Sequence, residues 1–142
     1  MQPAFSITLH DDVPESDGAR VDAGLGESNR TAARLEDVQP LACFARIGSN
    51  VIGGAVGRTW GACCELQQLW VSPAHRRQGI GADLVRAFEQ HAEARGCRTF
   101  YLETFSFQAP ALYAALGYVV KHELHGFAPH IVKYLMVREA RS

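Results

Sequence analysis

The stretch RRQGIGADLV, residues 76–85, decides the fold because two arginines and two glycines join a strand to a helix. Residues 63–71 before it alternate as a strand does and stop at Ser72-Pro73. From Ile80 onward apolar residues recur at helical spacing, and Gly96 is placed to end the helix. The sequence therefore predicts a strand, a glycine-containing turn and a long helix, in that order.

The turn has the composition of an anion-binding site. The first amide groups of a helix have no partner within the helix, and aligned peptide dipoles place about half a positive charge there. Gly79 and Gly81 carry no side chain that would keep a bulky anion away, and Arg76 and Arg77 add positive charge. The pattern predicts a cradle for a diphosphate, and a glycine loop with solvated arginines is the alternative.

Two known nucleotide-binding motifs match this turn only in part. The phosphate loop of nucleoside triphosphatases requires GxxxxGK[ST], and the turn lacks both the lysine and the hydroxyl residue that follows it. A dinucleotide fingerprint requires a third glycine where Leu84 stands, although Glu103 follows about twenty residues later, as the ribose-binding acid would. The dinucleotide interpretation stays open, but the chain is too short for two complete βαβ halves.

The rest of the pattern predicts a mixed sheet. Residues 41–47 and 51–60 are β-rich runs on either side of a turn signal. Glycines weaken any long helix in the polar segment 10–36, where we expect only helical pieces. Further strands are predicted at residues 5–9, 99–103, 118–122 and 131–137, and a short helix at 110–116. This order indicates an α+β (α/β-type) fold, with a central twisted sheet of about six or seven strands flanked by helices.

Composition narrows the functional class. The 142 residues suit one domain, 47% of them are apolar, and the net charge of -1 gives no basic block that would predict nucleic-acid binding. No signal peptide or membrane-spanning run is present, so we expect a cytoplasmic protein with no membrane partner. The four cysteines are expected to be reduced thiols, mostly in core-facing strands, and no metal site is expected because the histidines lack ligand spacing.

Two segments carry a resemblance to a known family. LQQLWVSPAHRRQGIGADLVRAFEQHA, residues 66–92, resembles the acetyl-coenzyme A signature of the GNAT N-acetyltransferase superfamily. FQAPALYAALGYVV, residues 107–120, resembles the later segment of that superfamily, a short helix with a tyrosine before an LGY strand entry. The resemblance covers about residues 41–137. It implies that residues 1–142 form a single N-acetyltransferase domain, GNAT-like, with a splayed parallel strand pair.

The resemblance also implies how acetyl-coenzyme A (acetyl-CoA) is bound as co-substrate. Its pantetheine arm would lie between the splayed strands and its diphosphate in the cradle. The residues that the resemblance assigns to the cofactor are Leu69, Trp70 and Val71 for the pantetheine amides, and Arg76, Arg77, Gln78, Gly79, Ile80 and Gly81 for the diphosphate.

Transfer of the acetyl group makes two chemical demands. An alkylammonium titrates near pH ~10.4 and must lose a proton before it attacks. Glu65 is the first candidate for the base, Glu103 the second, and Gln67 would only position the proton acceptor; exposed or loop-holding carboxylates are the alternatives. The leaving thiolate needs a proton or hydrogen bond, and Tyr113 stands where the resemblance places the tyrosine that supplies it, with a core tyrosine as the alternative.

The acceptor implied is a primary amine, with a small molecule favoured, and attack would be direct in a ternary complex. Phe105, Phe107 and the loop 125–130 are candidates for an acceptor pocket, whereas Trp60, Trp70 and Phe100 are expected in the core. A homodimer is the oligomeric state that the resemblance suggests. A module that binds acyl-CoA as a sensor without turnover is the alternative function.

Overall fold

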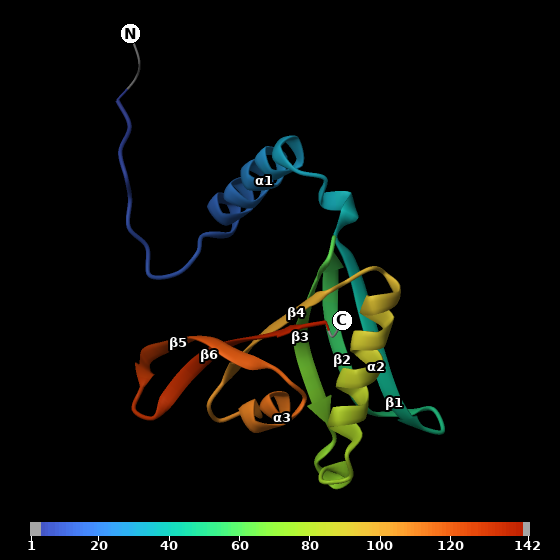
Figure 1. Cartoon of the computed structure of the whole chain (residues 1–142). Helices are drawn as coiled ribbons and strands as arrows, with labels where there is room; N and C mark the ends of the chain where they lie inside the picture. The colour runs from blue at the N-terminus through green and yellow to red at the C-terminus, as the bar shows by residue number, and fades with distance from the viewer. Residues whose placement is uncertain (1–3, 141–142) are drawn as a thin grey trace. The chain divides into compact units, whose positions relative to one another are not determined.

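The computed structural model describes residues 4–140. Its contacts divide the chain into two compact units, one that ends at Glu36 and one that begins at Asp37 (Figure 1). The second unit contains the entire sheet, so it holds every strand of residues 4–140. No helix within these residues is long and apolar enough to cross a membrane.

The first unit contains one continuous helix, α1 (Glu15–Ala32), of 18 residues. The prediction that glycines would break this segment into pieces was wrong. Each glycine in a helix costs only about 0.5–1 kcal/mol relative to alanine. Glu15 in the first turn and Arg30 in the last turn have the charges that the helix dipole favours. These gains, and the helix formers between the glycines, keep the helix continuous.

The predicted strand at residues 5–9 is also corrected. Residues 4–14 form neither helix nor strand up to the start of α1, and the apolar side chains of Phe5, Ile7 and Leu9 are exposed. Alternation of apolar and polar residues shows that a segment could pair, but a strand forms only where a partner is available.

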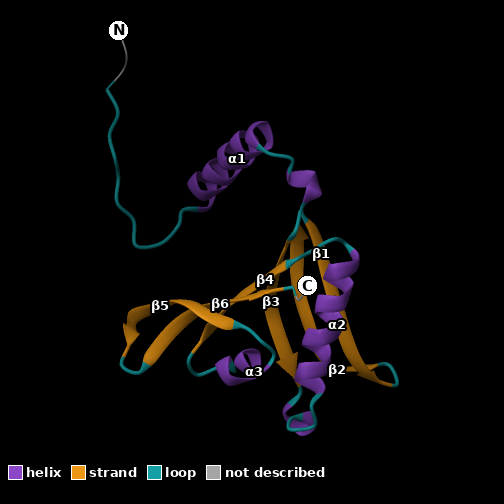
Figure 2. Cartoon of the chain, in the orientation of Figure 1, coloured by secondary structure: helices purple, strands orange, loops and turns teal. Residues whose placement is uncertain are grey.

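The second unit is built on one six-stranded sheet (Figure 2). The strand order is β1-β2-β3-β4-β6-β5, with every neighbouring pair antiparallel except β3 and β4. This confirms the mixed α+β fold and the lower of the two predicted strand counts. The strands are β1 (Gln39–Ile47), β2 (Asn50–Trp60), β3 (Cys63–Val71), β4 (Thr99–Phe105), β5 (Val119–Ala128) and β6 (Ile131–Glu139).

Two helices complete this unit, α2 (Ile80–Ala94) and α3 (Pro110–Ala115). Helix α2 packs on β1, β2 and β3 and buries its apolar stripe there, so it covers one face of the sheet. As predicted, Gly96 ends α2: it has a φ of 95° and donates its amide hydrogen bond to the Glu93 carbonyl. Strand β5 is longer than predicted and includes four of the six residues of the loop expected at 125–130.

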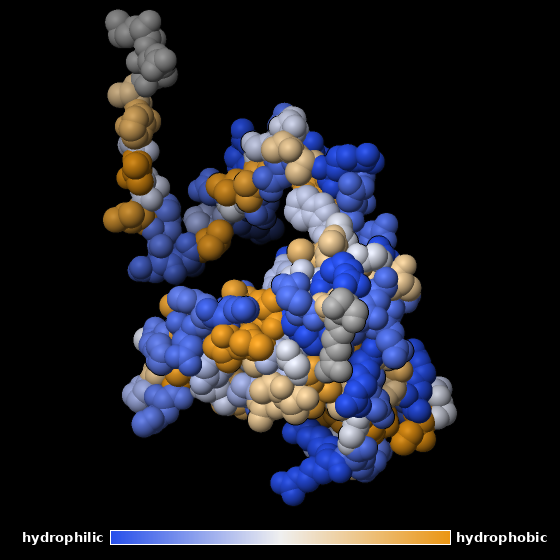
Figure 3. All heavy atoms as spheres, viewed as in Figure 1, coloured by the Kyte–Doolittle hydropathy of each residue, from blue (hydrophilic) through white to orange (hydrophobic). Residues whose placement is uncertain are grey.

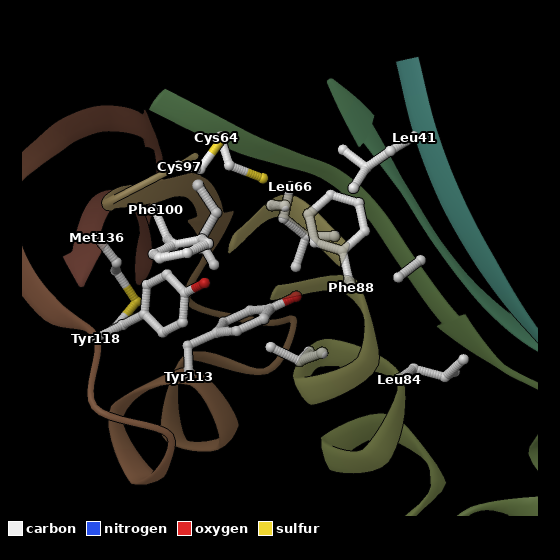
Figure 4. Packing of buried hydrophobic residues seen from close by; sticks show 14 residues of the cluster. Leu41, Cys64, Leu66, Leu84, Phe88, Cys97, Phe100, Tyr113, Tyr118 and Met136 are labelled. Carbon is white, nitrogen blue, oxygen red and sulfur yellow. The ribbon is translucent and has the colours of Figure 1, made fainter. Parts of the chain in front are cut away.

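The core lies between α2, the sheet and α3 (Figure 4). Its largest fully buried side chains include Phe88, Phe100, Leu102 and Met136. Cys64 and Cys97 are buried within it, whereas Cys63 is exposed. Space-filling shows hydrophobic side chains at the surface as well, among hydrophilic ones (Figure 3).

Strand β3 carries a β-bulge where the sheet begins to open. Val56 and Gly57 are consecutive on β2, but their partners on β3 are Gln68 and Leu66, so Gln67 is an extra residue. The parallel pairing of β3 with β4 ends at the pair Leu66–Leu102. Beyond this pair the two strands separate, which confirms the expected splayed parallel pair.

Gly57 tests how closely this bulge is packed. A Cβ at position 57 would meet the Glu65 carbonyl oxygen of the backbone and the Phe88 ring. We expect Gly57→Ala to lower the free energy of unfolding by about 1–3 kcal/mol, because neither neighbour can move freely. Denaturant unfolding followed by circular dichroism measures this loss.

Gly54→Ala on the same strand is the matched control. Its Cβ would press chiefly on the ring of Phe44, which is exposed and can turn away. We expect a clearly smaller loss for this variant, and equal losses for the two would show that the bulge is not the constraint.

Candidate active site

A cavity of the second unit opens where β3 and β4 separate. Its volume is about 1060 Å³. The turn before α2 lines one part of it, β2 and β3 another, and the end of β4 with the start of α3 a third. Eight of the nine residues predicted to bind the cofactor line this cavity; only Gln78 does not.

Strand β3 presents unpaired backbone groups to the cavity. Leu69, Trp70 and Val71 pair with β2 on one side, but β4 has left the other side beyond Leu66. The amide and carbonyl groups that point toward the gap therefore have no strand partner. An extended ligand with amides of its own can bind here as a strand would.

The turn before α2 presents a second set of free donors. In the described part of the chain, none of the amide groups of residues 79–82, at the start of α2, donates a backbone hydrogen bond to the protein. Gly79 is the N-cap of α2 with φ 80° and ψ 5°, a left-handed conformation followed by helix. Successive amides in such a pair converge and form an anion-binding concavity. The predicted cradle is therefore formed by the backbone.

The two arginines of the cradle differ in their contacts. Arg76 donates from Nε to the carbonyl oxygen of Val71 at 2.9 Å, which ties the turn to the end of β3. Arg77 has a φ of 63°, and its exposed guanidinium has no partner among residues 4–140. Arg77 is thus the freer of the two charges for a phosphate. Beside them, His75 lines the cavity, and its buried Nδ1 has no hydrogen-bond partner.

These features fit acetyl-CoA well. A diphosphate requires convergent donors and positive charge, and the cradle offers both. The pantetheine arm is extended and carries amides, and the open edge of β3 complements it. The described residues contain no group of three or more His, Cys, Asp and Glu side chains that could hold a metal ion.

Tyr113 on α3 lines the cavity and is 8% exposed. No group in the described residues forms a hydrogen bond with its hydroxyl. Burial raises the pKa of the Tyr113 phenol above its ordinary value. The hydroxyl is therefore protonated at neutral pH and free to donate a hydrogen bond.

Tyr113 packs against Tyr118, which belongs to a polar network; Figure 4 shows the side chains of the two tyrosines. The Tyr118 ring meets the Tyr113 ring edge to face, with centroids 6.0 Å apart. The Tyr118 hydroxyl donates to Oε2 of the buried Glu89 at 2.8 Å, and Arg138 Nε donates to the same oxygen at 2.9 Å. Arg138 in turn lies over the ring of Phe100. Burial raises the pKa of the Tyr118 phenol, and the Glu89 carboxylate adds to the shift.

The two candidate bases have different locations. Glu65 does not line the cavity, and its carboxylate accepts a hydrogen bond from Arg58 Nε at 2.9 Å. Glu103 does line it, immediately beyond the last parallel pair. Lys133 Nζ on β6 lies 2.7 Å from Glu103 Oε2. The structure thus brings Glu103 and Tyr113 to one cavity and leaves the first choice, Glu65, outside it. Gln67, predicted to position the proton acceptor, lines the cavity at the bulge.

The loop after β4 is held by side chains other than Glu103. Gln108 Oε1 accepts hydrogen bonds from the Thr104 hydroxyl and the Phe105 amide at 3.2 and 2.8 Å. Ser106 Oγ accepts from the Val132 amide at 3.0 Å. The alternative role of Glu103, holding Thr104 and this loop, therefore falls to Gln108 and Ser106.

The burial of the aromatic residues differs in part from the prediction. Phe100 is buried in the core as predicted, but Trp60 and Trp70 are about half exposed, at 48% and 51%, and Trp70 lines the cavity. Phe107 lines the cavity as well. Sequence reasoning missed Lys133, Gln108 and the network of Glu89 and Arg138. Of these residues, only Lys133 could have been identified from strand pairing. Lys133 pairs with Phe105 in the β4–β6 register, two residues from Glu103.

Comparisons with known proteins agree with this geometry. Residues 8–118 match the model of the Acetyltransferase (GNAT) family. The chain is 33% identical over 109 residues to the blasticidin-S acetyltransferase of Streptomyces morookaense, a match that covers 76% of this chain and 79% of that protein.

Two solved structures have the same fold. An acetyltransferase from Agrobacterium tumefaciens superimposes with a TM-score of 0.80 at 25% identity, over 95% of this chain and 99% of that one. A Bacillus anthracis structure with bound acetyl coenzyme A superimposes with a TM-score of 0.64 at 19% identity, over 72% and 64% of the two chains. With the family model, the cradle and the splayed strands in agreement, the chain belongs to the GNAT family of acetyltransferases, acyltransferases that use acetyl-CoA.

Proposed function

We propose that this enzyme transfers the acetyl group of acetyl-CoA to a primary amine of a small molecule, by direct attack in a ternary complex. One observation carries the proposal. A single cavity contains free donors for the cofactor, the unpartnered hydroxyl of Tyr113 and the carboxylate of Glu103. The cavity, of about 1060 Å³, is roomy enough for a small acceptor beside the reactive end of the cofactor.

The cofactor is positioned by the backbone. The amides of Arg76, Arg77, Gln78, Gly79, Ile80 and Gly81 bind the diphosphate in the proposal. The open edge of β3 at Leu69, Trp70 and Val71 binds the pantetheine amides. The thioester then lies between β3 and β4, where the acceptor can reach it.

The proton transfers are assigned to two side chains. Glu103 attracts the acceptor as an ammonium and takes one proton from it, directly or through water. The freed nitrogen lone pair attacks the thioester carbonyl carbon, so that a C–N bond forms and the C–S bond breaks. The sulfur leaves as a thiolate, to which Tyr113 donates its proton. The nitrogen loses its second proton as the amide forms, and this proton, passed on through water, restores the Tyr113 phenol. The unperturbed pKa values of a thiol and a phenol, ~8.5 and ~10, lie close together. Burial raises the pKa of Tyr113, so the hydroxyl that meets the departing sulfur is protonated and can donate to it.

The small-molecule acceptor is supported by the relative named for acetylation of blasticidin S. That relative shares 79% of its length with this chain, so the similarity extends well beyond the cofactor motif. The family match also begins at residue 8, inside the first unit. This supports the proposal that both units belong to one N-acetyltransferase domain.

The direct test is product formation. The purified chain is incubated with acetyl-CoA and a panel of amines that includes blasticidin S, lysine peptides and diamines, and N-acetylated products are identified by mass spectrometry. We expect acetylation of at least one small molecule and none of the peptides. Acetyl-CoA binding in calorimetry without product from any amine would instead support a sensor.

Tyr113 and Tyr118 form a matched pair for the second test. We expect Tyr113→Phe to lower kcat by about 10²-fold, with little change in KM for acetyl-CoA or in stability, because only a proton donor is lost. Tyr118→Phe removes a hydrogen bond to the Glu89 carboxylate and should lower the free energy of unfolding by about 1.5–3 kcal/mol. Steady-state kinetics and denaturant unfolding of both variants measure these effects.

The reverse assignment would remove Tyr113 from the mechanism. In that case kcat would be unchanged in Tyr113→Phe. Tyr118→Phe would lower kcat by more than its loss of folding stability explains.

Gly79 and Gly96 form the pair for the cradle. Both glycines have left-handed φ angles, 80° and 95°, and a Cβ at either would meet no protein atom within 4 Å. Alanine is therefore strained equally at both positions. Only at position 79 does the new methyl group enter the proposed diphosphate site.

We expect Gly79→Ala to raise KM for acetyl-CoA about tenfold, equivalent to about 1.4 kcal/mol of binding. Gly96→Ala should lose similar stability and keep its KM. If KM rose equally in both variants, general strain would account for the effect and the cradle would not.

A further inference from the structure

We propose that Lys133 competes with the acceptor's ammonium for the Glu103 carboxylate, and thereby influences which amines the enzyme accepts. The preferred acceptor is then a small amine cation with a flat apolar group beside its ammonium and without a carboxylate. This inference rests on the proposed function and names its substrate class.

The contacts of Lys133 are those that recognise an ammonium ion. Its Nζ lies 2.7 Å from Glu103 Oε2 and 5.6 Å from the centroid of the Phe105 ring. A carboxylate together with an aromatic face binds cationic nitrogen by charge and by attraction to the ring quadrupole. The protein thus already places one ammonium at this point.

The carboxylate faces the cavity, but the lysine does not. Glu103 lines the cavity, whereas Lys133 and Phe105 are not among its lining residues. Glu103 is also the only carboxylate among the described residues that line it; the other charged side chains there are Arg76 and Arg77 in the cradle. An acceptor cation is therefore drawn toward Glu103, where it competes with Lys133.

The competition is weak enough to be overcome. The side chains of Lys133 and Glu103 are 33% and 50% exposed. Ion pairs with this much solvent contact shift an equilibrium by only about two- to fivefold. An acceptor ammonium can share or take over the carboxylate, and Lys133 lowers the affinity for every amine by that modest factor.

An aromatic face in the wall of the same cavity selects the rest of the acceptor. Phe107 stacks on Phe105 with centroids 5.3 Å apart and an interplanar angle of 8°. Phe107 is 66% exposed and lines the cavity, so its outer face is open to a ligand. A flat group beside the ammonium can stack there. A carboxylate on the acceptor would find no partner at this wall, since Lys133 lies outside the lining.

Three amines of similar size separate these requirements. Benzylamine carries a cation and a flat ring, cyclohexylmethylamine has the cation without the flat ring, and 4-(aminomethyl)benzoate adds a carboxylate. Their dissociation constants are measured by calorimetry at neutral pH, with the full chain saturated with coenzyme A. For the natural sequence we expect benzylamine to bind more tightly than either of the others.

The variants then test Lys133 itself. Lys133→Met should tighten benzylamine binding about two- to fivefold, and Glu103→Gln should weaken it. In the Glu103→Gln background, Lys133→Met should give no gain, because no carboxylate remains to be freed. Lys121→Met is the matched control: Lys121 is the chain's other lysine, is exposed on β5, and its loss changes the net charge equally.

Several results would overturn the inference. They are weaker benzylamine binding in Lys133→Met, an equal gain in Lys121→Met or in the Glu103→Gln background, and no benzylamine binding at all. Tighter binding of 4-(aminomethyl)benzoate that Lys133→Met abolishes would make the pair a site for zwitterions instead. If the binding pattern holds but no amine is acetylated, the proposed catalysis fails while the cation site stands.

Discussion

Parallel pairing between β3 and β4 ends at Leu66 and Leu102, and the cavity depends on that early end. The bulge at Gln67 adds one residue to β3 just where the pairing stops. A bulge bends its strand and increases its twist, so β3 turns away from β4. Had the pairing continued, the amides and carbonyls of Leu69 to Val71 would be satisfied within the sheet and closed to a ligand. The early end of the β3–β4 pairing thus creates both the cavity and the open backbone edge that lines it.

The elements around this cavity place the cofactor-binding groups and the two proton-transfer residues at separate positions. The free amides and arginines lie at the start of α2, whereas Glu103 lies at the end of β4. Tyr113 comes from α3, whose other side is held against Tyr118 and the buried Glu89–Arg138 pair. Removing one partner of a buried charged network is costly, so this network holds Tyr118, whose ring packs on Tyr113. Burial and the contact with Tyr118 position the Tyr113 ring, although its hydroxyl has no hydrogen bond within the described residues.

Local sequence patterns predicted the parts of this design that are local in origin. The strand at residues 63–71, the helix from Ile80 and its glycine end depend on neighbours within a few residues, and they were predicted correctly. The cradle belongs to the same class, because helix-start amides are free in any helix. The predicted strand at residues 5–9 was wrong because a strand must pair with another strand, and the alternation of apolar and polar residues does not show whether one is available. The length of α1 was underestimated because the small cost of each glycine was considered without the favourable end charges and helix-forming residues of the same segment.

Roles that depend on distant contacts were the hardest to predict. Glu65 and Glu103 are similar in sequence context, but Arg58 on β2 pairs with the first and Lys133 on β6 with the second. Only the sheet register shows which carboxylate reaches the cavity. The partners of Glu89 lie 29 and 49 residues away, so no motif marks it as the partner of Tyr118 and Arg138.

The most direct test of this account is a crystal structure of the chain with coenzyme A. The account predicts the diphosphate within about 2.7–3.2 Å of amide nitrogens in the turn from Arg76 to Gly81, and the pantetheine arm along the open edge of β3. A coenzyme A molecule bound outside the gap between β3 and β4, or a diphosphate held by side chains alone, would contradict it.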